Sequence, residues 1–375
     1  MVGPAETFPQ KKSGITLRWQ IAAQLPASPG QQHALGFAGP VAGICNDVLL
    51  VAGGANFPAG MPWEGGKKKY YADIFVYFIK DSKLELLQTT DQLHEPIAYT
   101  ASCSTEYGVL YAGGENEKGI SSKVRIIRWN EADRKSITEK LANLPIAVTN
   151  AAMTVCNNIL YLAGGETVNG VSNHFYCLNL KHRSTSWKEL PALPVPVSHM
   201  VLVAVTKEKK PLICLAGGRK KNANGISDLY NGFYAFDIEE NKWSEKKSLP
   251  WPLMAGTGIA YGADDILLFG GDTGKQFHEA EILTQAINRT ADTALNERLI
   301  KQKNALQAAH PGFSKTILLY NAQTDEWVAS GEMDYPTQVT TVAITWKNTV
   351  FIPGGEIRAG VRTPLITAAS INHSP

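Results

Sequence analysis

Short apolar runs alternate with glycine-rich turns along this chain, and six of the runs end in a pair of glycines. The runs are LLVAGG, VLYAGG, LYLAGG, ICLAGG, LLFGG and VFIPGG, with glycine pairs at Gly53-Gly54, Gly113-Gly114, Gly164-Gly165, Gly217-Gly218, Gly270-Gly271 and Gly354-Gly355. Successive pairs are 60, 51, 53, 53 and 84 residues apart. A period that recurs this regularly indicates a repeat architecture, so the chain is read as one closed body rather than several domains.

Each repeat predicts four strands. Each run that ends in a glycine pair is preceded by another apolar run and a short turn, as in VAGICNDVLLVAGG. The two runs predict an antiparallel hairpin, whose strands we call a and b in chain order. A third strand with an aromatic residue and a fourth with Trp follow, as in Tyr176 with Trp187, Tyr234 with Trp243 and Tyr320 with Trp327. A period near 50 residues with this content is typical of kelch blades. The sequence therefore predicts an all-β, six-bladed kelch-type β-propeller. Each blade narrows toward the axis, so the strand ends there are expected to need glycine, which has no side chain and adopts positive φ.

The two ends of the chain predict how the ring closes. A Trp strand around 15–20 precedes the first repeat, while only a third strand, around 364–371, follows the last glycine pair. The N-terminal strand is expected to complete the sixth blade and to close the ring. The long gap holds a segment rich in Ala, Glu, Gln, Leu and Lys at 275–312, which predicts a helical insertion between strands b and c of the fifth blade. We expect one propeller domain at 13–375 after a short polar lead at 1–12.

Composition narrows the class of partner. With 36 basic and 34 acidic residues, the charge gives no basic field for nucleic acid or membrane, and no apolar run reaches 18 residues. The five cysteines form no CxxC pair and the eight histidines do not cluster, so we expect free buried thiols and no metal site. The lead lacks the apolar core of a signal peptide. The compartment is expected to be periplasmic if an export signal has been removed, with cytoplasmic as the alternative.

The loops after each glycine pair and the loops before each strand a should lie on one face of the ring. The first set contributes Asn56, Glu115, Glu166, Arg219, Asp272 and Glu356, and the second contributes His33, His94, Asn150, His199 and Gln338. Polar groups that converge on one concavity suit a small hydroxylated ligand. The residues expected to bind substrate are Asn56, Glu115, Glu166, Arg219, Asp272 and His199.

Two interpretations of the glutamates stay open at this point. Glu115, Glu166 and Glu356 would suit glycoside hydrolysis if they converge across the channel. Alternatively, Glu115 and Glu166 bind backbone amides at a repeated turn. The segment GGEIRAGVRT differs from the other repeats because it alone places a carboxylate, Glu356, and a guanidinium, Arg362, close together after the glycine pair.

This segment resembles the N-acetylneuraminate epimerases, or sialic acid mutarotases, which carry a similar Gly-Glu followed by Gly-x-Arg-Thr. The stretches YNAQTDEWVASGE and GFAGPVAGICNDVLLVAGGANF are similar to family segments too, although their order is rotated, as in the cyclically permuted mutarotase branch. The resemblance implies that Glu356 and Arg362 are the catalytic pair. It also implies an arginine where this chain has Ile97.

The implied activity is the interconversion of the α and β anomers of N-acetylneuraminate without a cofactor. Glu356 would take the anomeric proton, and Arg362 would grip the sugar carboxylate. The alternatives are a kelch propeller that binds a glycan or a protein without catalysis, and a mutarotase or hydrolase for another sugar. Copper oxidase chemistry would need a Tyr and His ligand set that cannot be assembled from this sequence.

Overall fold

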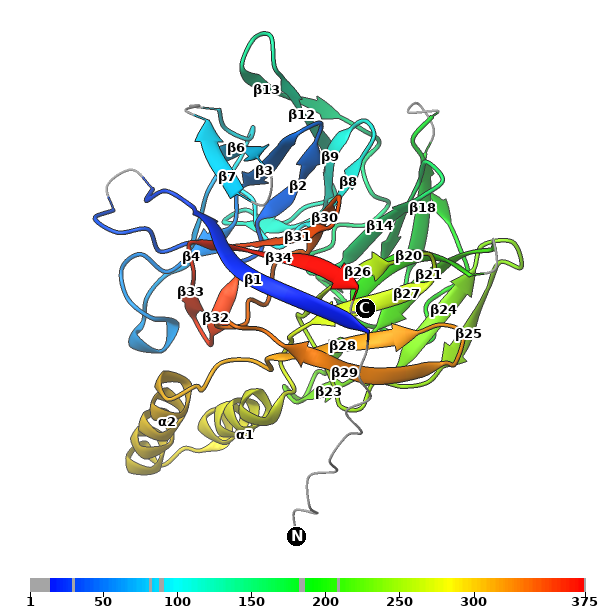
Figure 1. Cartoon of the computed structure of the whole chain (residues 1–375). Helices are drawn as coiled ribbons and strands as arrows, with labels where there is room; N and C mark the ends of the chain where they lie inside the picture. The colour runs from blue at the N-terminus through cyan, green and yellow to red at the C-terminus, as the bar shows by residue number, and fades with distance from the viewer. Residues whose placement is uncertain are drawn as a thin grey trace.

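The computed structural model describes residues 14–28, 31–80, 83–87, 91–181, 186–207 and 210–373, and these form six four-stranded antiparallel sheets around a common axis (Figure 1). The six-bladed propeller predicted from the repeats is therefore confirmed. The predicted lead at 1–12 lies outside the described residues. No helix in the described part of the chain is long and apolar enough to cross a membrane.

The first three blades follow one another along the chain. Blade one holds β2 (Val41–Cys45), β3 (Val48–Ala52), β6 (Ile74–Lys80) and β7 (Lys83–Leu87). Blade two holds β8 (Ala101–Thr105), β9 (Gly108–Ala112), β12 (Val124–Asn130) and β13 (Lys135–Lys140). Blade three holds β14 (Ala152–Cys156), β15 (Ile159–Ala163), β18 (Phe175–Asn179) and β19 (Lys188–Glu189).

The remaining blades continue the ring and return to its start. Blade four holds β20 (Val201–Lys207), β21 (Lys210–Ala216), β24 (Phe233–Asp237) and β25 (Lys242–Lys246). Blade five holds β26 (Thr257–Tyr261), β27 (Asp265–Phe269), β28 (Thr316–Asn321) and β29 (Glu326–Glu332). Blade six holds β30 (Ile344–Trp346), β31 (Thr349–Pro353), β34 (Leu365–His373) and β1 (Ile15–Gln24).

The sixth blade is built from both ends of the chain, as the sequence predicts. Strand β1 pairs antiparallel with β34 from Ile15 opposite His373 to Gln24 opposite Leu365. The two strands lie side by side in Figure 1, where the first strand is blue and the last is red. Because β1 is the outermost strand of this blade, the ring is closed by main-chain hydrogen bonds rather than by side chains.

The connections between strands b and c project from one face of the ring. Five of the six, all within the described residues, form two-stranded hairpins: β4 (Ala55–Asn56) with β5 (Lys69–Tyr70), β10 (Glu115–Asn116) with β11 (Gly119–Ile120), β16 (Glu166–Thr167) with β17 (Gly170–Val171), β22 (Arg219–Lys221) with β23 (Ser227–Leu229), and β32 (Glu356–Arg358) with β33 (Val361–Arg362). The first also carries a short 3-10 helix, η1 (Pro62–Glu64). Blade five instead carries α1 (Lys275–Arg289) and α2 (Thr293–Ala308), which confirms the predicted helical insertion (Figure 1).

The glycine pairs join each blade to the next. Both glycines of every pair have positive φ, but close approach explains the choice of glycine better than the taper of the blades. A Cβ on Gly164 would lie 2.2 Å from the carbonyl oxygen of Val197 in blade four, and the N–H of Gly165 donates to that oxygen at 2.8 Å. The same bond recurs at four of the other five pairs, and Gly355 donates to Phe37 to join blade six to blade one.

Tryptophans of the outer strands make a second set of links. The indole N–H of Trp187 donates to the carbonyl of Ala142, and Trp327 donates to Lys247, at 2.9 and 2.8 Å. Both indoles are buried and reach back to the preceding blade. The aromatic residues therefore fill the space between neighbouring blades.

The five cysteines are free, in agreement with the sequence. Cys45 and Cys156 both end strand a of their blades, whereas Cys103 lies mid-strand in β8. Burial raises the pKa of Cys103 and of Cys214 to about 12, which keeps both thiols protonated and unreactive at neutral pH.

Candidate functional site

Glu356 and Arg362 lie directly opposite each other in the hairpin of β32 and β33. Opposite residues of an antiparallel pair point to the same face, so the spacing of six residues brings the two side chains together. Nη1 of Arg362 lies 3.3 Å from Oε2 of Glu356. The N–H of Gly360, at the turn, donates to Oε1 of Glu356 at 2.8 Å. Both oxygens of the carboxylate are thereby oriented.

The guanidinium of Arg362 is buried beside Phe57 and Tyr99. Its side chain is only 6 % exposed, and its central carbon lies 4.6 Å from the centre of the Phe57 ring. Nη2 donates to the hydroxyl of Tyr99 at 3.4 Å. Nε and Nη1 are buried and form no hydrogen bond with the residues that the structure describes. Buried donors without partners are costly unless a ligand uses them, so Arg362 is suited to hold an anionic group.

A cavity of about 230 Å³ lies beside Glu356. Its polar lining is formed by His199, Arg219, Asp272, Gln276, Gln307, His310, Thr340 and Glu356. Four of the residues predicted for the site, Arg219, Asp272, His199 and Glu356, are therefore brought together here. The cavity is a concave space with convergent polar groups, which is the usual form of a small-ligand site.

The helical insertion covers this cavity with Phe277 and Ala280 of α1 and Leu306 of α2. Helix α1 is tied to blade four, where Glu281 accepts hydrogen bonds from both the N–H and the hydroxyl of Ser227. Helix α2 is tied to blade one, where the amide of Asn304 donates to the carbonyl of Trp63 at 3.0 Å. The insertion therefore spans from blade four to blade one and covers one side of the cavity.

Burial shifts the titration of three groups around the cavity. It raises the pKa of Asp272, against the opposing effects of the Gly274 N–H and of the charges on His310 and Arg219. It lowers the pKa of His199 well below the usual range, and the Arg219 charge adds to this. Burial also lowers the pKa of His310. Both imidazoles are therefore neutral at pH 7.

Arg219 also forms an ion pair with Glu166. Its Nη2 lies 2.9 Å from Oε1 of Glu166, which also accepts from the hydroxyl of Ser198 at 3.1 Å. The guanidinium carbon lies 5.0 Å from the ring centre of Phe277 in α1. This corrects the expectation that blade six alone brings a carboxylate and a guanidinium so close. The pair is not evident from the sequence because Glu166 and Arg219 belong to neighbouring blades.

Glu115 has a similar cross-blade partner. Its Oε1 lies 3.0 Å from Nζ of Lys68 and accepts from the hydroxyl of Tyr70 at 2.7 Å. Side chains of blade one, rather than turn amides, therefore engage Glu115, and the turn-amide interpretation applies best to Glu356 and Gly360. The Lys68 ammonium lies 4.6 Å from the ring centre of Tyr99. Burial opposes its charge, but Tyr99 and Glu115 outweigh burial and raise the pKa of Lys68.

The mouth of the central channel is framed by main chain. One residue of each blade, just before strand a, has positive φ: Gly39, Tyr99, Asn150, His199, Ala255 and Thr340. The N–H of each donates to the carbonyl of its counterpart in the preceding blade at 2.7 to 3.1 Å, and Gly39 donates to Thr340. The six hydrogen bonds therefore form a closed ring.

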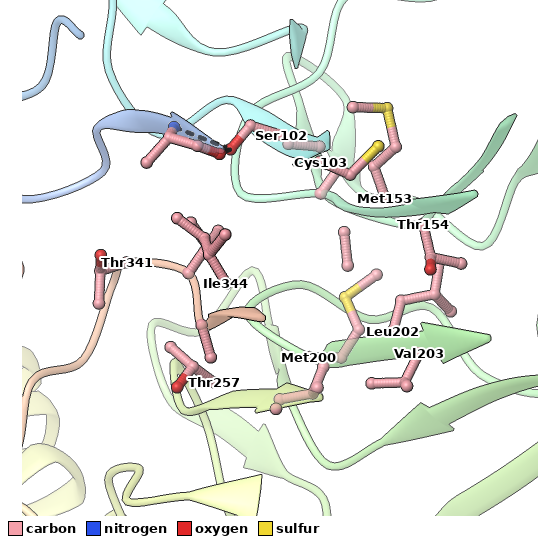
Figure 2. Close-up of a pocket in the computed structure, with 18 of the residues that line it drawn as sticks. Ser102, Cys103, Met153, Thr154, Met200, Leu202, Val203, Thr257, Thr341 and Ile344 are labelled. Atoms are coloured by element: carbon pink, nitrogen blue, oxygen red, sulfur yellow. Dashed lines mark hydrogen bonds between the residues drawn. The ribbon is translucent and has the colours of Figure 1, made fainter. Parts of the chain in front are cut away.

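Inside this ring, the innermost strand of each blade (strand a) borders a larger cavity of about 470 Å³. Figure 2 shows Ser102, Met153, Met200 and Ile344, each from a different blade, arranged around it. No Asp, Glu, Lys or Arg is among the described residues that line it, whereas Arg219, Asp272 and Glu356 line the smaller cavity. The candidate site is therefore displaced from the axis and lies under the helical insertion, not over the channel as a whole.

Several residues expected at the site have other positions. Asn56 is 1 % exposed, and its amide donates to Gly36 and accepts from Tyr71. Gln338 is 1 % exposed, donates to three backbone carbonyls and accepts from Thr367. Asn56 and Gln338 therefore brace the loops rather than face a ligand.

Three further positions contribute no side chain to either cavity described above. His33 and His94 are exposed. Ile97 is buried in the core and offers only its carbonyl, which accepts from Gly54. The position of the expected arginine therefore adds no side chain to the site around Glu356.

Sequence reasoning missed Tyr99, Lys68 and His310. Tyr99 could have been found by register, because it precedes its glycine pair by fourteen residues, as Asn150 does. Lys68 and His310 lie in connections of irregular length, where no register applies. Among the described residues, no group of three or more His, Cys, Asp or Glu side chains is placed to hold a metal ion.

The family model and the curated relatives that match this chain carry the same description. A family model described as N-acetylneuraminate epimerase matches residues 5–135 and 141–374. The N-acetylneuraminate epimerase of Salmonella typhi is 23% identical over 231 residues, which is 61% of this chain and 58% of that protein. The corresponding protein of Haemophilus influenzae (strain PittEE) is 22% identical over 222 residues, 59% of this chain and 56% of that protein. That of Vibrio vulnificus is 37% identical over 122 residues, 30% of each.

The chain thus matches less than two thirds of the length of these curated relatives. Among solved structures, that of YjhT matches with a TM-score of 0.61 and 15% identity, over 93% of this chain and 99% of that one. At this identity the likeness bears on the fold alone.

Proposed function

The chain belongs to the N-acetylneuraminate epimerase family, and from this membership we propose that it is a sialic acid mutarotase. Such an isomerase interconverts the α and β anomers of N-acetylneuraminate. The observation that carries the proposal is the pairing of Glu356 with Arg362 across one hairpin, beside a cavity lined by further polar groups. The proposed substrate is a sugar acid of small size.

Glu356 is the proposed base. Mutarotation opens the hemiketal ring and closes it on the other face, so the anomeric hydroxyl must lose its proton. The carboxylate lines the cavity, and its two oxygens are fixed by Gly360 and Arg362, so it is oriented before substrate arrives. General base catalysis of this kind typically contributes about 100-fold to 10,000-fold.

Arg362 is the proposed anchor for the sugar carboxylate. Its charge is permanent, Nε has no hydrogen-bond partner among the described residues, and Nη1 has only the 3.3 Å ion pair with Glu356. A carboxylate bound there would place the attached anomeric carbon close to Glu356, since the two side chains are adjacent. The geometry thus supports one residue for anchoring and the other for proton transfer.

The remaining predicted contacts divide by position. Arg219, Asp272 and His199 line the cavity and are proposed to contact the hydroxyl groups of the sugar. Glu166 is proposed to act through Arg219, which it fixes by an ion pair. Glu115 lies with Lys68 on the neighbouring loops, where it would bound the site rather than take part in chemistry.

Proton NMR of freshly released α anomer tests the proposal. The intact protein should bring the anomers to equilibrium faster than buffer, and Glu356→Gln should lower the rate at least about 100-fold. Asp47→Asn, in the exposed turn between β2 and β3, is the matched control and should leave the rate unchanged. If the intact protein binds the sugar but does not raise the rate of anomer exchange above the rate in buffer, the chain is a binding module. If it accelerates only other sugars, the substrate assignment is wrong.

A further inference from the structure

His310 lies in the cavity beside Glu356 and has no part in the pairing described above. It follows α2, at the point where the chain returns to β28, and it is 8 % exposed. Both His310 and Glu356 line the same cavity of about 230 Å³. The imidazole packs against Phe313, with ring centres 5.0 Å apart, so its orientation is fixed.

The hydrogen bonds of His310 determine which nitrogen carries the proton. The N–H of Gly312 donates to Nδ1 at 3.1 Å, so Nδ1 must present a lone pair. A neutral imidazole that accepts at Nδ1 carries its hydrogen on Nε2. No described residue accepts a hydrogen bond from Nε2, although the ring is nearly buried in a cavity lined by polar groups. The structure thus leaves one oriented donor for a ligand.

We propose that His310 is a further catalytic residue, whose Nε2–H donates a hydrogen bond to the ring oxygen of the sugar while Glu356 acts on the anomeric hydroxyl. This inference rests on the proposed mutarotase function. A fixed donor at an oxygen that gains negative charge stabilises the transition state, and a neutral imidazole can fill that role.

The step balances with these two residues. The carboxylate of Glu356 takes the proton of the anomeric hydroxyl, and the electrons of that O–H bond become the second bond of the new carbonyl. The bond between the anomeric carbon and the ring oxygen breaks, and its electron pair stays on the ring oxygen. That oxygen, held by the N–H of His310, then takes the proton back from the Glu356 carboxylic acid. Reclosure on the other face reverses these events.

Burial keeps His310 in the neutral form that the proposal requires. Burial lowers its pKa, the carboxylates of Asp272 and Glu356 oppose that effect, and the cation of Arg358 adds to it. The imidazole is therefore neutral at pH 7 and becomes protonated only at a more acidic pH. Protonation places a hydrogen on Nδ1, opposite the N–H of Gly312, and breaks the turn that orients the ring.

Two substitutions separate catalysis from folding. His310→Phe keeps an aromatic ring but removes the donor, and should lower kcat by about 100-fold with little change in KM. His310→Gln keeps an N–H donor and should retain activity within roughly tenfold of the intact protein. The kcat of the intact protein should fall at acid pH with an apparent pKa below 6.5. In His310→Gln this fall should be absent, because glutamine does not titrate. His174→Gln, at a partly exposed histidine of blade three that lies outside both cavities, should change neither.

The outcomes separate the two proposals. If the intact protein does not accelerate mutarotation, the proposed function fails, and the role of His310 fails with it. If the intact protein is active and His310→Phe is equally fast, only the role of His310 is overturned. Should His310→Phe not fold, a long-range proton–nitrogen NMR spectrum of the intact protein decides. The Nε2–H form with an Nε2 signal that moves on adding sugar is expected, and an Nδ1–H form would overturn the proposal.

Discussion

Arg362 donates a hydrogen bond to Tyr99, and this contact connects two residues that are 263 positions apart in the sequence. Tyr99 is one of the six residues whose main chain frames the channel mouth. The candidate anion-binding residue of the last blade is therefore positioned by the second blade. Its geometry depends on closure of the whole ring rather than on the hairpin alone.

Replacing Arg362 by Gln should impair the enzyme through loss of substrate binding. Hydrogen bonds to charged groups contribute about 1.5 to 3 kcal/mol, so kcat/KM for N-acetylneuraminate should fall roughly 10-fold to 150-fold. The methyl ester of the sugar, which lacks the carboxylate charge, should be affected much less. Anomer exchange rates of both substrates, measured by NMR over a range of concentrations, provide the comparison.

Arg362→Lys controls for charge in this experiment. It keeps the positive charge but loses the planar set of donors, so it should recover only part of the preference for the acid over the ester. An equal loss for acid and ester in Arg362→Gln would contradict substrate anchoring. It would indicate instead that Arg362 acts on the carboxylate of Glu356.

Gly164→Ala should destabilise the propeller by about 2 to 4 kcal/mol. The new Cβ would lie 2.2 Å from the carbonyl oxygen of Val197, so the link to blade four must open, and the left-handed backbone adds strain. Gly65→Ala is the matched control, because its φ is also positive and nothing lies within 4 Å of its Cβ. Its cost should be about 1 to 2 kcal/mol. Urea unfolding measures both, and equal costs would show that close approach is not the cause.

The buried thiol of Cys214 should make the protein less stable at alkaline pH. Its pKa rises from 9.0 to about 12 because burial disfavours the thiolate. Above pH 9 the unfolded chain loses this proton while the folded protein keeps it, so the free energy of unfolding falls as the pH rises towards 12. One such thiol accounts for up to about 4 kcal/mol at pH 12.

Cys214→Ala should flatten this decline in unfolding experiments between pH 9 and pH 12. Val203 lies directly opposite Cys214 on the neighbouring strand, so Val203→Ala removes similar core volume without removing the thiol. It should lower stability at pH 7 and keep the alkaline slope of the intact protein. A Cys214→Ala variant with an unchanged slope would assign the decline to other groups.

The architecture was accessible from sequence because its signals are local and repeated. Each glycine pair closes a strand, and the spare strand at one end matches the missing strand at the other. The pairing of Glu356 with Arg362 was accessible for the same reason, since a turn of known length brings two nearby residues together. The motif of blade six therefore located one edge of the candidate site.

The rest of the site depends on contacts between blades, which sequence spacing does not encode. Arg219 meets Glu166 across 53 residues, and His310 joins the cavity only because α1 and α2 fold back over it. Asn56 and Gln338 were wrongly expected to face the ligand, because a polar side chain in a loop can equally satisfy buried backbone groups. The sequence pattern does not distinguish these two uses of an amide.

The ring of six backbone hydrogen bonds has a consequence for how such a protein can change over evolutionary time. Because the mouth is held by main-chain atoms, the ring of hydrogen bonds itself does not require particular side chains, and this chain carries Gly, Tyr, Asn, His, Ala and Thr at the six positions. New ligand specificities can therefore arise by substitution of single residues at these six positions, while the backbone of the propeller stays the same.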